Sequence, residues 1–102
     1  MTGWKFVTNH ALVLCLIAQQ PRITAREISL SLGVTERTTH NIISDLEADG
    51  YVTKTREGRR TRYSIDPEMP LRHKMHEDKE VGDLLEILGW EKRPKRVKSA
   101  AS

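Results

Sequence analysis

Cationic side chains are crowded into one short stretch of this 102-residue chain. Residues 51–65 contain a single acidic residue, Glu57, and five basic ones: Lys54, Arg56, Arg59, Arg60 and Arg62. A guanidinium group can hold a phosphate through two parallel hydrogen bonds, so this composition suits a phosphate backbone. A basic stretch can equally be a solvated surface. The choice between the two interpretations depends on the helices and strands that carry these side chains.

The net formal charge of only +3 conceals an uneven distribution. Residues 77–91 are strongly acidic, and residues 92–102 carry five basic residues and no acidic one. The length fits one domain, which we place at residues 1–90. Residues 91–102 contain almost no apolar side chains and are expected to form a basic, disordered tail.

A first helix is predicted from Thr8 to Gln20. Thr8 is a suitable N-cap, and Pro21 prevents the helix from continuing. The longest apolar run of the chain, residues 11–18, lies inside it. A membrane span needs about 20 apolar residues, so no span is expected. Because the run is apolar on nearly every face, the helix should be buried on more than one side, with cover available from a second subunit.

Two short helices joined by a tight turn are predicted next. Thr24 and Glu27 form a capping box at the start of one, and Gly33 ends it. Thr35 caps the following helix, which Gly50 closes. That helix has one buried face at i, i+3, i+4, i+7 spacing: Thr39, Ile42, Ile43 and Leu46. Two helices separated by about three residues, with a glycine in the turn, are typical of a helix-turn-helix.

A β-hairpin is predicted directly after these helices. Residues 51–55 and 61–65 are rich in β-branched and aromatic residues, and residues 56–60 form a polar loop around Gly58. The expected inward side chains are Val52, Tyr63 and Ile65. A helix-turn-helix followed by a basic hairpin is a winged helix, so the basic stretch would be the wing.

A last helix is predicted from about Glu77 to Leu88, with Gly89 at its end. Its apolar stripe consists of Val81, Leu84, Leu85 and Leu88. Its other face is acidic and carries Glu77, Asp78, Glu80, Asp83 and Glu86. Such a face cannot sit against DNA, so we expect this helix to serve dimerisation.

The stretch from residue 24 to 65 resembles the winged helix-turn-helix of MarR- and ArsR-type transcriptional regulators. The resemblance rests on residues 32–35, on residues 46–52 with Gly50 before an aromatic-valine pair, and on the wing from Gly58 to Tyr63. It implies a mainly α fold with a small β-hairpin wing (α+β) and a prokaryotic, dimeric DNA-binding regulator. The chain is shorter than a typical MarR protein, whose extra helices build a ligand cleft, so no such cleft is implied.

The helix at about residues 36–49 is therefore expected to read the major groove, where Arg can bridge guanine and Asn adenine. The wing would lie on the phosphate backbone or probe the minor groove, and the backbone donors at Thr35 suit a phosphate. The predicted DNA-binding residues are Thr35, Arg37, Thr38, His40, Asn41, Ser44, Lys54, Arg56, Arg59, Arg60 and Arg62.

A homodimer is expected because the apolar stripe of the last helix needs cover, within or across subunits, and the first helix offers it. The predicted interface residues are Leu12, Leu16, Val81, Leu84, Leu85 and Leu88. Two recognition helices about 34 Å apart would then read a palindrome. The alternative is a winged helix used for protein–protein assembly.

Other reactive side chains give weaker signals. His73 and His76, beside Glu77, suit a metal-responsive, ArsR-like repressor, a further alternative. Because the cysteines of one ArsR metal motif are missing, we predict no metal and no cofactor. Cys15 lies in the apolar run and is expected to be a buried hydrophobe. Nothing suits a catalytic site, so no enzyme is expected, and a single cysteine favours the cytoplasm.

Overall fold

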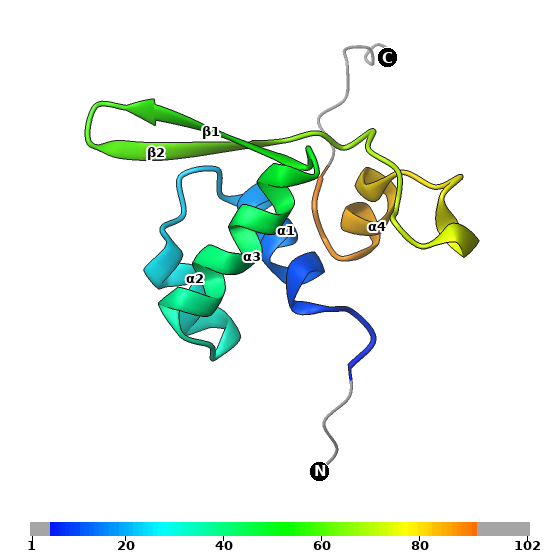
Figure 1. Ribbon diagram of the computed structural model, residues 1–102, viewed down its shortest axis with the longest axis horizontal. Helices are drawn as coiled ribbons and strands as arrows, with labels where there is room; N and C mark the ends of the chain where they lie inside the picture. The colour runs from blue at the N-terminus through cyan, green and yellow to red at the C-terminus, as the bar shows by residue number, and fades with distance from the viewer. Residues whose placement is uncertain (1–4, 92–102) are drawn as a thin grey trace.

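The structure is a computed structural model that describes residues 5–91. Figure 1 shows a helical body from which one long hairpin projects. The order of elements is α1 (Asn9–Gln19), α2 (Ala25–Leu32), α3 (Glu36–Ala48), β1 (Val52–Glu57), β2 (Arg60–Ile65), the 3-10 helix η1 (Lys74–His76) and α4 (Val81–Ile87). The predicted mainly α fold with a two-stranded antiparallel hairpin is confirmed. None of the helices within residues 5–91 is both long and apolar enough to span a bilayer.

Three threonines start the first three helices. The hydroxyl of Thr8 accepts a hydrogen bond from the backbone N–H of Ala11, at 3.1 Å, and Thr35 caps α3 in the same way. At α2 the predicted capping box is complete. Thr24 Oγ1 accepts from the N–H of Glu27 at 3.1 Å, and Glu27 Oε1 accepts from the N–H of Thr24 at 3.0 Å. Caps of this kind typically contribute about 1 kcal/mol each, so the helix starts are fixed locally.

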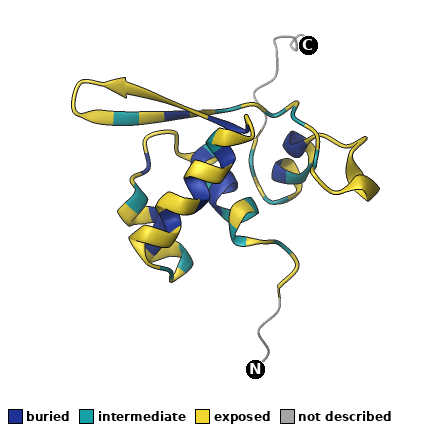
Figure 2. Cartoon of the chain, viewed as in Figure 1, coloured by how far each residue is buried: buried dark blue, intermediate teal, exposed yellow. Residues whose placement is uncertain are grey.

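Helix α1 forms the centre of the core, as Figure 2 shows in dark blue. Val13 and Ile17 are fully buried, and the helix contacts α2, α3, β2 and α4. The expected burial on more than one side is therefore achieved within a single chain. The predicted inner face of α3 is also confirmed, since Thr39, Ile42, Ile43 and Leu46 are all buried.

The α3–β1 junction consists of three residues, 49–51. Gly50 adopts φ 87° and donates its N–H to the carbonyl of Glu47 at 3.1 Å. The N–H of Tyr51 donates to the carbonyl of Leu46 at 2.9 Å. These two bonds are the Schellman pattern, which closes a helix and sets the direction of the chain that leaves it. Strand β1 then begins at Val52.

The two strands of the hairpin are each one residue longer, and the turn is shorter, than the sequence indicated. Strand pairing runs from Val52 opposite Ile65 to Glu57 opposite Arg60, leaving a two-residue turn of Gly58 and Arg59. The predicted loop at residues 56–60 is therefore wrong, because cross-strand pairing extends into its polar residues. Gly58 has φ 64°, which suits a tight hairpin turn. Val52 and Tyr63 are buried as expected, and Ile65 is half-buried.

Helix α4 begins at Val81, four residues later than predicted. The chain before it is held extended against residues 66–73, the connector between β2 and η1, because Pro70 and Glu80 form an antiparallel bridge. The N–H of Leu71 donates to the carbonyl of Lys79 at 3.0 Å. These tertiary bonds override the helical pattern at residues 77–80. As a result, Asp83 and Glu86 are the members of the predicted acidic face that lie on the helix.

A close backbone contact fastens α4 to the connector. The N–H of Gly82 donates to the carbonyl of Pro67 at 2.8 Å, and an added Cβ at Gly82 would lie 2.9 Å from Pro67 Cβ and from its carbonyl oxygen. At the other end, the N–H of Trp90 donates to the carbonyl of Leu85 at 2.9 Å and closes the helix in the predicted Schellman pattern. Val81 and Leu85 are buried in the common core.

Candidate nucleic-acid interface

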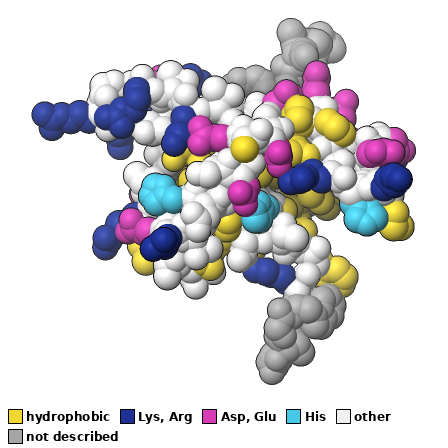
Figure 3. Space-filling view, in the orientation of Figure 1, with side chains coloured by type: hydrophobic (Ala, Val, Ile, Leu, Met, Phe, Trp, Pro, Cys, Tyr) yellow, Lys and Arg dark blue, Asp and Glu magenta, His cyan; other side chains and the backbone are white. Residues whose placement is uncertain are grey.

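The helix-turn-helix and the wing tip lie at one end of the molecule, opposite α4 and η1 (Figure 1). Lys and Arg side chains gather along the hairpin and near α2 and the start of α3, as Figure 3 shows in dark blue. All eleven predicted DNA-binding residues are exposed, on α3, at its N-cap or on the hairpin. The fold thus brings these residues to one side of the body, although they span 28 sequence positions from Thr35 to Arg62.

The N-terminal half of α3 presents polar side chains to solvent. Arg37, His40 and Asn41 are exposed, and within residues 5–91 none of them forms an ion pair or side-chain hydrogen bond. Ser44 continues the same face. Residues three or four positions apart share one side of a helix, and the buried side of α3 contains Ile42 and Ile43. The exposed polar residues therefore lie on the opposite side.

At the start of α3, two threonine hydroxyls are linked. Thr35 Oγ1 accepts the N–H of Thr38 and donates its own proton to Thr38 Oγ1, at 3.0 Å each. The hydroxyl of Thr35 is therefore fully occupied in capping. The hydroxyl proton of Thr38 remains able to donate to a phosphate or a base. Of the two residues, Thr38 is the better candidate for a side-chain contact.

The C-terminal half of α3 is acidic and tied to its surroundings. Asp45 Oδ2 lies 2.8 Å from His10 Nε2 on α1, and Asp49 Oδ2 lies 2.7 Å from a guanidinium nitrogen of Arg72. Between them, Glu47 Oε1 lies 3.5 Å from Lys54 Nζ on β1. Exposed pairs contribute only about 0–1 kcal/mol each. Together they connect α3 to three different elements and fix how it is oriented.

The strand register divides the wing cations between two faces of the hairpin. Successive side chains of a strand point to opposite faces. Lys54 and Arg56 therefore share the face of the buried Val52, whereas Arg60 and Arg62 lie on the other face, with Glu57. Arg59 occupies the turn. The sequence analysis grouped these five side chains together, and the structure places them on two faces and in the turn.

Sequence analysis missed an ionic contact that holds the wing near its tip. Glu57, the single acid of the wing, lies 2.8 Å from Arg22 and 3.9 Å from Arg62. Closer to the base, the N–H of Tyr63 donates to the carbonyl of Pro21 at 2.8 Å. The loop between α1 and α2 thus supports one edge of the hairpin. The only sequence signal was the lone acid among five cations.

The side chains considered for metal or redox chemistry have ordinary structural roles. His73 Nδ1 accepts the N–H of Met75 at 3.0 Å and caps η1. Within residues 5–91, no three His, Cys, Asp or Glu side chains are grouped so that they could hold a metal. Cys15 is buried, as predicted, and burial raises the pKa of its thiol. A thiol with a raised pKa is a poor nucleophile and a poor redox sensor.

The residues assigned to a dimer interface fall into two groups. Val81 and Leu85 are already covered within one chain, at 5% and 0% exposure. The others are half-buried: Leu12, Leu16, Leu84 and Leu88. On α4, Ile87 is 82% exposed. Of the six predicted interface residues, four therefore keep some exposed surface that a second subunit could contact, and two do not.

Comparison with known proteins defines the class. Residues 9–53 match a family model described as winged helix-turn-helix DNA-binding, so this part of the chain is a winged helix-turn-helix DNA-binding domain. That family is not enzymatic, in agreement with the expectation from the sequence. The match ends just inside β1 and does not reach the connector or α4.

Among solved structures, the chain is similar to CymR, the global cysteine regulator of B. subtilis. The two are 18% identical, the similarity covers 98% of this chain and 76% of CymR, and the TM-score is 0.50. At this identity the similarity concerns the fold alone. No curated protein matches the sequence significantly.

Proposed function

We propose that this protein is a sequence-specific transcriptional regulator that reads duplex DNA as a homodimer. The observation that carries the proposal is the contrast along α3. Its N-terminal half offers exposed hydrogen-bonding side chains without ionic partners among the described residues, and its C-terminal half is anchored by two ion pairs and by the hydrogen bond between His10 and Asp45. A helix held at one end and exposed at the other can be presented to the major groove.

In this proposal Arg37 and Asn41 read bases. Arg can donate two hydrogen bonds to guanine and Asn can pair with adenine, and each such contact is worth about 1–3 kcal/mol of discrimination. Thr38, His40 and Ser44 lie on the same exposed face and contact bases or neighbouring phosphates. The cap at Thr35 contributes through the backbone donors of the first turn.

The wing contributes phosphate contacts mainly through its tip. Arg56, Arg59 and Arg60 form no ion pair with another described residue, so no partner has to be displaced before they bind a phosphate. Lys54 and Arg62 are already paired with Glu47 and Glu57. We therefore assign Lys54 and Arg62 chiefly to positioning the wing, and the three arginines to binding.

The test is selection of bound sequences from a random duplex pool, followed by a salt titration on the selected duplex. A consensus should emerge, and the logarithm of affinity should fall linearly with the logarithm of salt concentration. Arg59→Ala should weaken binding to all duplexes and reduce the salt slope by about 0.9. Asn41→Ala should instead relax the sequence preference.

Lys74→Ala is the matched control, because it removes an exposed cation on η1, at the end of the molecule opposite the wing tip. It should leave the salt slope unchanged. If the full chain binds no duplex even at low salt, the winged helix serves protein–protein assembly instead, and the proposal is wrong.

For dimerisation we propose the outer surface of α1 and α4, where Leu12, Leu16, Leu84 and Leu88 are half-buried and Ile87 is exposed. Two-fold dimers are the commonest oligomers, and a dimer would select a palindromic consensus. Light scattering at micromolar concentration should give twice the chain mass. A strictly monomeric mass contradicts this part of the proposal. As a prokaryotic regulator, the protein would act in the cytoplasm, where the DNA lies.

A further inference from the structure

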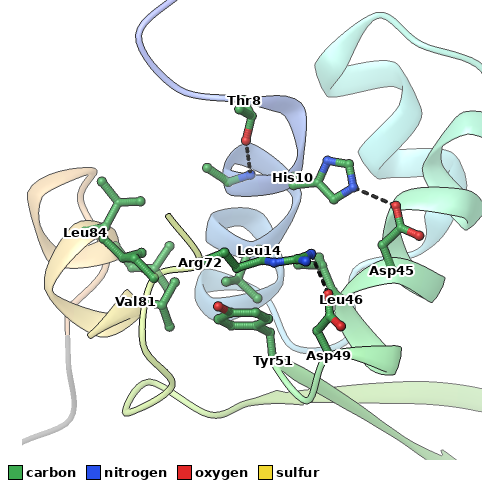
Figure 4. Close-up of a pocket in the computed structure, with 13 residues that line it drawn as sticks. Thr8, His10, Leu14, Asp45, Leu46, Asp49, Tyr51, Arg72, Val81 and Leu84 are labelled. Carbon is green, nitrogen blue, oxygen red and sulfur yellow. Dashed lines mark hydrogen bonds and ion pairs between the residues drawn. The ribbon is translucent and has the colours of Figure 1, made fainter. Parts of the chain in front are cut away.

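A cavity of about 400 Å³ opens between α1, the C-terminal end of α3 and α4. Figure 4 shows it from the side, with Leu84 and Val81 on one wall, Asp45 and Asp49 on the other, and Tyr51 beneath. Its volume falls within the range of small-molecule sites, which is about 300–1,000 Å³. It lies away from the wing tip, beside the anchored half of α3.

The interior of this cavity is apolar. Figure 3 shows hydrophobic atoms at the surface between α3 and α4, bordered by charged side chains. The apolar lining residues come from four segments far apart in sequence: Ala11, Leu14, Leu46, Tyr51, Leu71, Val81, Leu84 and Leu85. Such a lining can cover the hydrocarbon part of a ligand.

The polar residues of the cavity lie at its rim and carry an excess of negative charge. Asp45 and Asp49 stand one turn apart on α3, and Arg72 is the one residue of fixed positive charge among the lining residues. The remaining ionisable lining residues are His10 and Tyr51, so the rim has a net charge of −1 when both are neutral. Each aspartate uses one oxygen, Oδ2, for its hydrogen bond or ion pair. The second oxygen of each can attract a cation.

Tyr51 closes the cavity on the side of β1. Its hydroxyl donates to the carbonyl of Pro70, which satisfies the polar end of the side chain. The ring forms part of the cavity lining.

We propose that this cavity binds a small lipophilic organic cation, an apolar body that carries one ammonium group. The hydrocarbon part would fill the apolar interior, and the ammonium would lie at the rim beside the second oxygen of Asp45, away from the guanidinium of Arg72. An anionic ligand is disfavoured, because the guanidinium of Arg72 already contacts Asp49 at 2.7 Å and an anion would face two carboxylates. The proposal is independent of DNA binding.

The test uses three probes of similar size: benzyltrimethylammonium, neutral N-benzylacetamide and anionic phenylacetate. Each is titrated into the ¹⁵N-labelled full-length chain at pH 7, and amide shifts are followed by NMR. The cation should bind at a single saturable site with shifts at Ala11, Leu46 and Leu84. Its affinity should exceed that of the neutral probe about tenfold, and phenylacetate should bind most weakly.

Two pairs of substitutions separate charge at the rim from charge elsewhere. Asp45→Asn with Asp49→Asn keeps the shape of the rim and should lower the affinity for the cation about tenfold. Asp83→Asn with Glu86→Gln removes the same charge from exposed positions of α4 and should leave the affinity unchanged. If the rim pair fails to fold, Asp45→Asn alone should still lower the affinity about threefold. Ala11→Phe, which fills the cavity, should abolish the shifts.

Several results would overturn the proposal. Equal or tighter binding of N-benzylacetamide or phenylacetate would show that charge does not select the ligand. No saturable binding, or shifts that map to the wing, would show that the cavity is not the site. Shifts at Ala11 and Leu84 that arise on raising the protein concentration alone would show that a second copy of the chain fills it.

Discussion

The two halves of α3 belong to one helix and share one buried face, but they treat charge in opposite ways. In the N-terminal half, Arg37 is exposed and has no ionic partner among the described residues. In the C-terminal half, Asp45, Glu47 and Asp49 each have a partner on a neighbouring element. The C-terminal half of α3 is thus anchored to its neighbours, and we call it the held end. The N-terminal half presents exposed side chains without an ionic partner among the described residues, and we call it the offered half.

This difference has a physical reason. A side chain that must bind an external partner loses affinity if an internal partner has to be displaced first, because the released group must then be solvated again. A side chain that only orients the helix gains from being paired, even when the pair itself is worth little. Pairing therefore distinguishes positioning residues from contacting residues more clearly than exposure does, since both kinds are exposed.

Removing a buried side chain that supports both halves of α3 should have the largest effect, and that effect should be on stability. Ile43 is 2% exposed on the inner face of α3. Ile43→Ala should lower the free energy of unfolding by about 2–5 kcal/mol, because a cavity replaces the buried side chain. Urea denaturation followed by circular dichroism measures this. Ser44→Ala, at the next and exposed position, should change stability by less than about 0.5 kcal/mol; equal losses would mean that the inner face is not the support.

A second substitution, Gly82→Ala, lies in α4, on the side of the molecule where the C-terminal half of α3 is anchored. Gly82→Ala places a Cβ 2.9 Å from the backbone oxygen of Pro67. The connector and α4 must separate, which should cost about 1–3 kcal/mol. Thermal unfolding gives the value, with the exposed neighbour substitution Asp83→Ala as control. Folded Gly82→Ala protein should still bind DNA normally, because the offered half of α3 is untouched; a loss of DNA affinity would show that the halves are not independent.

The comparison is sharpened by removing one arginine of the N-terminal half of α3 and the arginine that pairs with its C-terminal end. Arg37→Ala should weaken binding to the selected duplex by about 1–3 kcal/mol, because a bidentate base contact is lost. Arg72→Ala should weaken it less than twofold. Fluorescence anisotropy with labelled duplex at fixed salt measures both. Equal effects would mean that pairing does not separate the two roles.

The smallest expected effect concerns an anchoring pair itself. A double-mutant cycle of Asp49→Ala and Arg72→Ala should give a coupling energy of about 0–1 kcal/mol, because both side chains are largely exposed. The coupling should decrease in 1 M salt, where the Debye length falls to about 3 Å. A coupling well above this range would make the held end a source of stability rather than of orientation.

Local signals in the sequence were sufficient to predict the helix starts. The capping box joins Thr24 and Glu27, which are three positions apart, and Gly33, predicted to end the helix, adopts φ 74°. Patterns of this range depend on neighbouring residues alone. The same reasoning identified the exposed face of α3, because its buried face repeats with the helical period.

Contacts between distant residues were not predictable in this way. The extended segment before α4 results from the Pro70–Glu80 bridge, which overrides a convincing helical pattern. The pair of His10 and Asp45 joins positions 35 residues apart. No spacing rule connects such positions, so neither the anchors of α3 nor the rim of the cavity could be derived from the sequence.

The junction at Gly50 has a consequence for the kind of duplex that can bind. Two backbone hydrogen bonds across the short α3–β1 junction set the direction in which the wing leaves the helix. If α3 enters a groove and the wing contacts the adjoining strand, as proposed, the junction sets the distance between these two contacts. A duplex in the A-form, whose major groove is deep and narrow, would not fit this spacing whatever its bases. The shape of the nucleic acid would thus be checked before its sequence.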